Sequence, residues 1–280
     1  MKKIFRVLIA SDMHYTTLYT YSNMDKDDRL QLWVDGIIAE NKSNPIDLII
    51  ILGDMSLDHW GWNGGGSWQR EPRESETKLF MERYLSQLPK DITKIVLPGN
   101  HELYSNEKWK ELTGYNRNES FVLGNNLFIM LDSYAGAVDP VYQGKGINDN
   151  PYKPVDMEFI KSTIDAHSKC TNVFLLSHHF DLSQENEAFK NFLKSDKRIQ
   201  GLFSGHTHKS NVINLGEEYN DLSIAQTGGF LYEGNRGYRD IVIKNDEIVS
   251  QYIIPQCQYI IDGIPRNTER TSVDILIRKI

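Results

Sequence analysis

Residues 47–54 read DLIIILGD, an unbroken apolar run that ends in glycine and aspartate. A continuous apolar run of this length is typical of a strand buried on both faces, as in a parallel sheet. Similar runs occur along the chain as FRVLIA (5–10), KIVLP (94–98), NLFIMLD (126–132), NVFLLS (172–177) and GLFS (201–204). Apolar residues at helical spacing occupy 28–41, 76–88, 155–169 and 186–195. Strands that alternate with helices up to about residue 200, and mainly strands thereafter, indicate an α/β fold built in layers.

The composition is that of an ordinary globular chain of 280 residues, without internal repeats, and one domain is the simplest organisation. The formal net charge of −7 argues against a nucleic-acid partner, because such proteins normally present a basic face. Cys170 and Cys257 form no CxxC pair and are expected to stay reduced. No stretch approaches the ~20 apolar residues of a membrane-spanning helix, and the first apolar run stops at Ala10. The sequence therefore predicts a cytoplasmic protein with no membrane association.

Polar side chains follow five of the apolar runs at the point where each run ends. They are Asp12, His14, Asp54, Asn100, His101, His178, His206 and His208. Taken singly, an aspartate here is more often a helix cap or turn former, and Asn100 suits a turn. Ligands of α/β sheets, however, gather outside the carboxyl ends of the strands. Without His101, the set offers seven oxygen and nitrogen ligands suited to Mn, Fe, Zn or Co, more than one tetrahedral zinc needs. Two metal ions that share one carboxylate would use them all.

The ordered blocks DMH (12–14), GD (53–54), GNHE (99–102), H (178) and GHTH (205–208) resemble those of the calcineurin-like metallophosphoesterases. The resemblance covers residues 12–208. It implies a four-layer α-β-β-α sandwich with a dinuclear metal centre at the strand ends. We expect a single metallophosphoesterase domain over residues 1–280, because residues 209–280 read as completing strands and a C-terminal tail.

The resemblance implies two ligand sets. Asp12, His14, Asp54 and His208 would hold one metal, and Asp54, Asn100, His178 and His206 the other, so that Asp54 bridges. Mn or Fe is favoured, and Zn, Ni or Co also suit the ligands. A water between two cations loses its proton near neutral pH and becomes the nucleophile. His101 would not bind metal but would act as the acid for the leaving group, with Glu102 a candidate to orient it.

The substrate expected is a small-molecule phosphodiester or phosphomonoester such as a nucleotide. The alternatives are a non-catalytic metal-binding scaffold of the same fold, or a nuclease of the family. Residues 55–75 are rich in tryptophan and glycine, and His59, Trp60 and Trp62 are expected to contact substrate; a loop packed on the surface is the alternative. No tyrosine follows the GD block, so no Fe(III)–tyrosinate centre is expected. His179 should support the site and not bind metal, since adjacent strand residues face opposite sides. The oligomeric state is left open.

Overall fold

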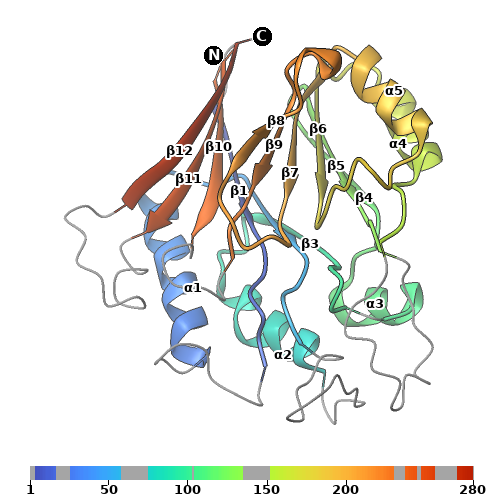
Figure 1. Cartoon of the computed structure of the whole chain (residues 1–280). Helices are drawn as coiled ribbons and strands as arrows, with labels where there is room; N and C mark the ends of the chain where they lie inside the picture. Colours follow the sequence, from blue (N-terminus) through green and yellow to red (C-terminus); the bar gives the residue numbers. More distant parts are fainter. Residues whose placement is uncertain are drawn as a thin grey trace.

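The computed structural model describes residues 4–16, 26–57, 75–102, 104–134, 152–229, 237–244, 247–255 and 270–279. Within them, two six-stranded sheets face each other (Figure 1). The first sheet has the order β12-β11-β10-β1-β2-β3, and the second the order β4-β5-β6-β7-β9-β8.

The strands of the first sheet are β1 (Ile4–Ala10), β2 (Leu48–Leu52), β3 (Thr93–Leu97), β10 (Tyr238–Lys244), β11 (Glu247–Pro255) and β12 (Arg270–Lys279). Those of the second are β4 (Glu119–Leu123), β5 (Asn126–Leu131), β6 (Asn172–Ser177), β7 (Ile199–Ser204), β8 (Val212–Asn214) and β9 (Ser223–Gln226). The helices are α1 (Lys26–Ser43), α2 (Glu76–Arg83), α3 (Asn106–Thr113), α4 (Met157–Ala166) and α5 (Glu187–Ser195), with 3₁₀ turns η1 (Leu85–Gln87) and η2 (Glu217–Tyr219).

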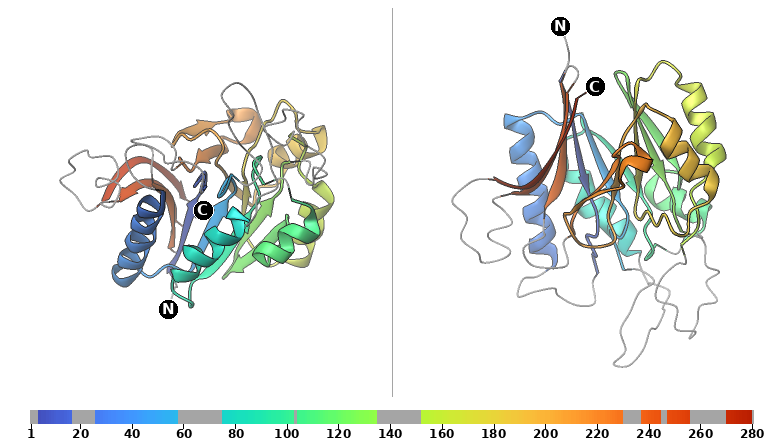
Figure 2. Two further views of the ribbon diagram at one scale, coloured as in Figure 1. Left: turned by 90° about the horizontal axis from the view of Figure 1, so that it is seen from below. Right: turned by 45° about the horizontal axis from the view of Figure 1, so that its top comes forward.

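Three buried clusters establish the layering. Residues such as Leu8 and Ile49 pack outward against Trp33 of α1 and Phe80 of α2. The opposite faces of the two sheets pack on each other in a second cluster, and the outer face of the second sheet packs on α4 and α5 in a third. Figure 2 shows the helices on the two outer faces. The four-layer α-β-β-α sandwich is therefore confirmed.

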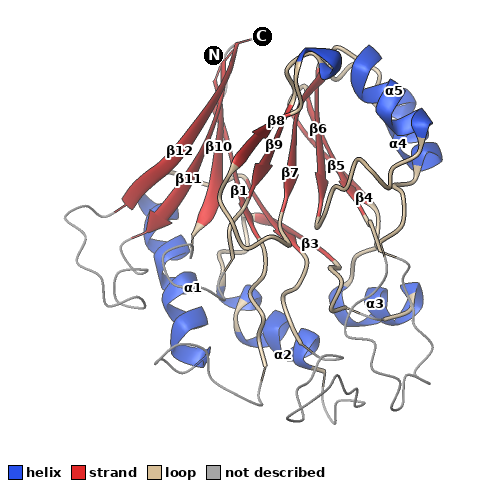
Figure 3. Ribbon diagram, in the orientation of Figure 1, coloured by secondary structure: helices blue, strands red, loops and turns tan. Residues whose placement is uncertain are grey.

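Strand direction decides where the site forms. β1, β2 and β3 are mutually parallel, and so are β5, β6, β7 and β9. Their carboxyl ends consequently lie at one end of each sheet, where the connecting loops gather between the sheets (Figure 3).

The helical segment expected over 76–88 differs in one respect: α2 ends at Arg83 and the chain continues as the 3₁₀ turn η1.

Candidate metal centre

The loops that follow the parallel strands are joined to one another by hydrogen bonds. The backbone N–H of Asp12 donates to the Gly53 carbonyl at 3.1 Å, which ties the loop after β1 to the loop after β2. The backbone N–H of His206 donates to Asp12 Oδ2 at 3.0 Å, which brings in the loop after β7. The His178 ring, after β6, contacts the Leu52 carbonyl through Nδ1. Segments far apart in sequence thus converge, as the strand-end pattern predicted.

The glycines of the sequence blocks let these loops approach one another closely. A Cβ on Gly99 would lie 2.1 Å from Asp54 Oδ1, and one on Gly205 would lie 2.4 Å from Ser11 Oγ. Real Cβ atoms do not tolerate such contacts, so a side chain at either position would push a neighbouring loop away. Glycine before Asn100 and before His206 is therefore a requirement of the loop crossing.

The first ligand set surrounds Oδ1 of Asp12. His208 Nε2 lies 3.3 Å and His14 Nε2 lies 3.8 Å from this oxygen. His14 Nε2 also lies 3.7 Å from Asp54 Oδ2. The ligand atoms of Asp12, His14 and His208 all lie within 4.8 Å of one another, as a shared cation requires.

The second ligand set is tighter. Asn100 Oδ1 lies 3.0 Å from His178 Nε2 and 2.9 Å from His206 Nδ1. His178 Nε2 lies 3.2 Å from Asp54 Oδ2. Neighbouring ligands at ~2.1 Å from an octahedral cation are about 3.0 Å apart, so these separations match the edges of a coordination sphere. Asp54 Oδ2 is near imidazoles of both sets, which is the position a bridging carboxylate oxygen occupies.

Buried polar atoms provide a separate test of whether cations fit. Asp12 Oδ2 accepts hydrogen bonds from the Ser11 hydroxyl and from the His206 backbone. Asp12 Oδ1 and His14 Nε2 are buried and make no hydrogen bond within the described part of the chain. Leaving such atoms unsatisfied costs ~1–3 kcal/mol each, and coordination to a cation would remove that cost. The donor atoms therefore fit a metal centre of mixed carboxylate, amide and imidazole ligands.

Backbone conformation singles out the same residues. In the described ranges, seven non-glycine residues have a positive φ, and five of them belong to the ligand sets: Asp12 (55°), His14 (48°), Asp54 (50°), His206 (66°) and His208 (55°). Left-handed backbone costs ~1–3 kcal/mol per residue and clusters at functional sites, where the surrounding structure enforces it. Asp and His tolerate it better than most residues.

Electrostatics favours the protonation state that a metal ligand needs at Asp12, Asp54, His14 and His206, and the opposite state at His178. Burial alone would raise the pKa values of Asp54 and Asp12, but the neighbouring histidines hold both below their usual range. Burial lowers the pKa values of His14 and His206 to about 4. Burial would also lower the pKa of His178, but the Asp54 and Asp12 carboxylates outweigh it and raise that pKa to about 10. His178 would therefore give up a proton on binding a cation.

His101 lies beside the shared carboxylate, with Nε2 at 3.6 Å from Asp54 Oδ2 and its ring centroid at 5.2 Å from that of His14. Its ligand atom falls within 4.8 Å of those of His14 and Asp54, so distance alone admits it as a ligand as well as an acid. Glu102 accepts hydrogen bonds from the backbone N–H groups of Gly99 (2.6 Å), Asp54 (2.9 Å) and Ser56 (3.1 Å). This carboxylate therefore binds the loops after β2 and β3 together.

Two further side chains adjoin the second set. The His179 ring stacks on His206, with centroids 4.4 Å apart and planes at 27°, in keeping with the supporting role expected of it. Tyr134, which follows β5, places its hydroxyl 3.5 Å from His206 Nδ1 and was missed by the sequence reasoning. Its only local signal is that it follows another buried parallel strand, in LDSY (131–134). His59, Trp60 and Trp62 lie outside the described residues, as does the segment 58–74.

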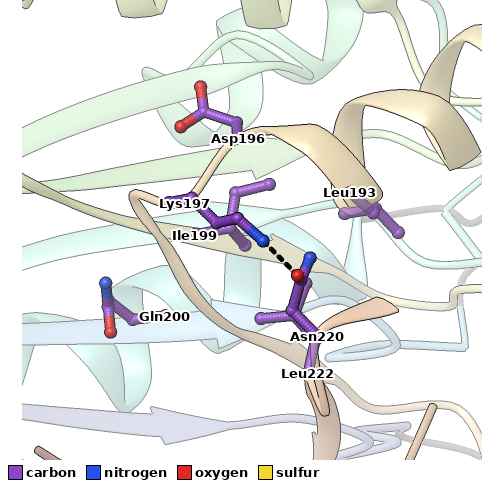
Figure 4. A pocket seen from close by; sticks show the side chains of 7 residues that line it. All are labelled: Leu193, Asp196, Lys197, Ile199, Gln200, Asn220 and Leu222. Carbon is purple, nitrogen blue, oxygen red and sulfur yellow. Dashed lines mark hydrogen bonds between the residues drawn. The ribbon is translucent and has the colours of Figure 1, made fainter. Parts of the chain in front are cut away.

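A hollow of about 140 Å³ lies elsewhere, between α5, β7 and the turn after η2. Lys197 donates a hydrogen bond to Asn220 across it, and Leu193 and Leu222 line it (Figure 4). None of its lining residues belongs to either ligand set, so it is separate from the metal centre.

Comparison with known proteins identifies the family of this chain and structures that share its fold. The family described as calcineurin-like phosphoesterase matches residues 5–210. A dimetal phosphatase from Danio rerio is similar in structure, with a TM-score of 0.64, 13% identity, and coverage of 89% of this chain and 95% of that one. Purple acid phosphatase PPD1 from yellow lupin seeds has a TM-score of 0.60 at 12% identity, covering 100% of this chain and 54% of that one.

GAP50, the anchor in the inner membrane complex of Plasmodium, has a TM-score of 0.54 at 12% identity, over 98% of this chain and 89% of that one. At such identities these structures show the fold alone. No curated protein sequence matches the chain. Within the described residues, no helix is both long and apolar enough to cross a membrane.

Proposed function

The chain belongs to the calcineurin-like phosphoesterase family, which makes it a metal-dependent phosphoester hydrolase, and we propose that it acts on a small phosphoester through two divalent transition-metal ions. One observation carries the proposal. Asp54 Oδ2 lies within 3.2–3.7 Å of imidazole nitrogens from both ligand sets, so one carboxylate oxygen can serve two cations.

In this proposal Asp12, His14, Asp54 and His208 hold one cation, and Asp54, Asn100, His178 and His206 hold the other. The spacing of the ligand atoms and their buried, partly unsatisfied state support the assignment. Mn or Fe suits the mixed oxygen and nitrogen donors best, and Zn, Ni or Co would also bind them.

When bound, two cations supply an activated water and neutralise charge on the phosphoryl group. The residues of the chain supply the remaining functions, which are metal ligation and proton transfer. Asn100 ligates through a neutral oxygen and so adds no charge that would repel the phosphate. His101 holds a proton at the edge of the site and delivers it to the leaving oxygen. Its backbone N–H donates to Asp54 Oδ1 at 3.1 Å, which keeps the acid in register with the bridging carboxylate.

We further infer that the whole chain forms one domain, because β10, β11 and β12 from the C-terminal part complete the sheet begun by β1. The substrate we favour is a nucleotide-like phosphodiester or phosphomonoester, with His59, Trp60 and Trp62 as its outer contacts. The net charge of −7 disfavours the alternative of a nuclease.

Metal analysis together with ester turnover tests this function against a scaffold that binds without catalysis. Protein prepared without chelators should carry two transition metals per chain and, with Mn²⁺, should hydrolyse bis-p-nitrophenyl phosphate but not a nitroanilide amide. Asp54→Ala should abolish both properties. A chain that holds two metals yet turns over none of a panel of nucleotides, cyclic nucleotides and sugar phosphates would be a scaffold.

A further inference from the structure

Tyr134 is held firmly at the end of β5. Its backbone N–H donates to Asp132 Oδ1 at 3.0 Å, and Arg117 fixes that aspartate through an Nε–Oδ2 contact of 2.8 Å. Ser133 and Ser177 join the ends of β5 and β6 through their hydroxyls at 2.9 Å. β5 pairs in parallel with β6, the strand that precedes His178, and Leu131 lies opposite Ser177, so Tyr134 follows β5 at the same end of the sheet at which His178 follows β6.

The Tyr134 side chain lies against the second ligand set. Its ring centroid is 5.7 Å from that of His178 and 6.3 Å from that of His206, and the residue is only 3% exposed. The hydroxyl is 3.5 Å from His206 Nδ1, the nitrogen that also lies 2.9 Å from Asn100 Oδ1. A separation of 3.5 Å is at the outer limit for a hydrogen bond, so this contact is weak.

Cation binding would change which acceptor the Tyr134 hydroxyl can donate to. The lone pair of His206 Nδ1 that could accept from Tyr134 is the one that would bind a cation, so a coordinated Nδ1 cannot accept the hydroxyl proton. A phosphoryl group at the centre would bring several acceptor oxygens to the same place. Tyrosine is a suitable partner for them because it donates without a charge of its own.

The two sides of the centre then carry complementary donors. His101 adjoins His14 of the first set, at 5.2 Å between rings, whereas Tyr134 adjoins His206 of the second. A phosphoryl group between the sets would meet a donor from each side. Donors aimed at oxygens that gain charge are among the strongest contributors to catalysis.

We propose that Tyr134 is a further substrate-binding residue, whose hydroxyl donates a hydrogen bond to a phosphoryl oxygen beside the second ligand set. This inference rests on the proposed function, because it needs a phosphoester bound at the metal centre.

Tyr134→Phe removes the hydroxyl and keeps the ring, and Tyr152→Phe is its matched control. The two rings are 6.2 Å apart, but the Tyr152 hydroxyl donates to Glu185 and accepts from the Asp181 backbone N–H at 3.2 Å, away from the ligand sets. Metal content, melting temperature, the Kd of inorganic phosphate by calorimetry and bis-p-nitrophenyl phosphate kinetics are measured for both. Tyr134→Phe should keep its metals and bind phosphate about 10- to 150-fold more weakly, the effect of one lost hydrogen bond to a charged group. Tyr152→Phe should match wild type in metal content, phosphate affinity and ester kinetics, although the loss of its two hydrogen bonds should lower its melting temperature.

Unchanged phosphate affinity in Tyr134→Phe, beside an active wild type, would overturn the inference and leave the proposed function standing. Metal lost in step with affinity would overturn it by making Tyr134 a ligand. If wild type itself holds no metal and hydrolyses no ester, the proposed function fails first. If Tyr134→Phe does not fold, the zinc-loaded chain is instead labelled with 3-fluorotyrosine at position 134, or at position 152 as the control. Added phosphate should shift the ¹⁹F resonance at position 134 and leave that at position 152 unchanged. The absence of a shift at position 134 would refute the inference.

Discussion

Gly99→Ala should disable the metal centre by displacing the carboxylate that both ligand sets share. The added Cβ would lie 2.1 Å from Asp54 Oδ1 and 2.6 Å from the Asp54 backbone nitrogen. Non-bonded heavy atoms are comfortable at about 3.5 Å, so the loop after β2 has to retreat by about 1 Å. Oδ1 is the oxygen that accepts from the His101 backbone N–H at 3.1 Å, and that bond is lost with the movement.

Two costs add in this variant. Overpacking a filled site costs ~1–3 kcal/mol, and a buried N–H without its acceptor costs another ~1–3 kcal/mol. The free energy of unfolding should therefore fall by about 2–6 kcal/mol. A misplacement of about 1 Å among reacting groups can lower the rate ~10²-fold, and Asp54 is the proposed ligand of both cations, so ester turnover should fall at least that far.

Urea unfolding, metal analysis and turnover of bis-p-nitrophenyl phosphate by Mn²⁺-loaded protein measure these effects. Gly201→Ala is the control, since Gly201 lies in β7 and the nearest atom to an added Cβ is 3.9 Å away. We expect that variant to stay within about 0.5 kcal/mol of wild type. A Gly99→Ala protein with two metals and wild-type rates would show that the close loop crossing does not position Asp54.

Three other predictions concern the ligand sets and the acid. Asp54→Ala should lose both metals by elemental analysis, whereas His14→Ala should lose mainly one; equal losses would contradict a bridging role. His101→Ala should keep its metals and lose ~10²–10⁴-fold with an alkyl leaving group but much less with a nitrophenolate, and loss of metal would instead identify a ligand. The pKa of His178 is raised to about 10, so His178 is protonated at pH 7 and cation binding should tighten as the pH rises from 6 to 8. Calorimetry in buffers of different ionisation enthalpy should register the released proton. Binding that does not depend on pH would refute this prediction.

Much of the fold and of the site was predictable because the informative signals are local. A strand buried on both faces must be apolar throughout, so β2 and β6 are visible as short apolar runs. In a parallel arrangement, the residue after each strand faces the same end of the sheet. The position of Asp54 or His178 could therefore be inferred without knowledge of any contact.

The remaining features have weak local signals. Helix α3 (Asn106–Thr113) is only two turns long and buries little beyond Trp109, so no apolar periodicity develops, although Ser105 caps its start and Gly114 ends it in the left-handed conformation. Strand β4 (Glu119–Leu123) is half-buried along its length, because it lies at a sheet edge. Tyr134 is significant only through its distance from His206, and sequence carries no such distance.

The conformation of the ligands explains why the site needs so large a scaffold. Five ligand residues in left-handed backbone, at ~1 kcal/mol each, cost about 5 kcal/mol together, comparable with the lower end of a typical domain's stability. Local preference cannot hold them there, and the hydrogen bonds that do, such as His14 N–H to the Asp54 carbonyl at 2.9 Å, run between loops. Those loops are fixed in turn by strands packed in three apolar clusters. The ligand geometry is thus a property of the assembled sandwich. Cations that bind only this folded arrangement should therefore raise the free energy of unfolding.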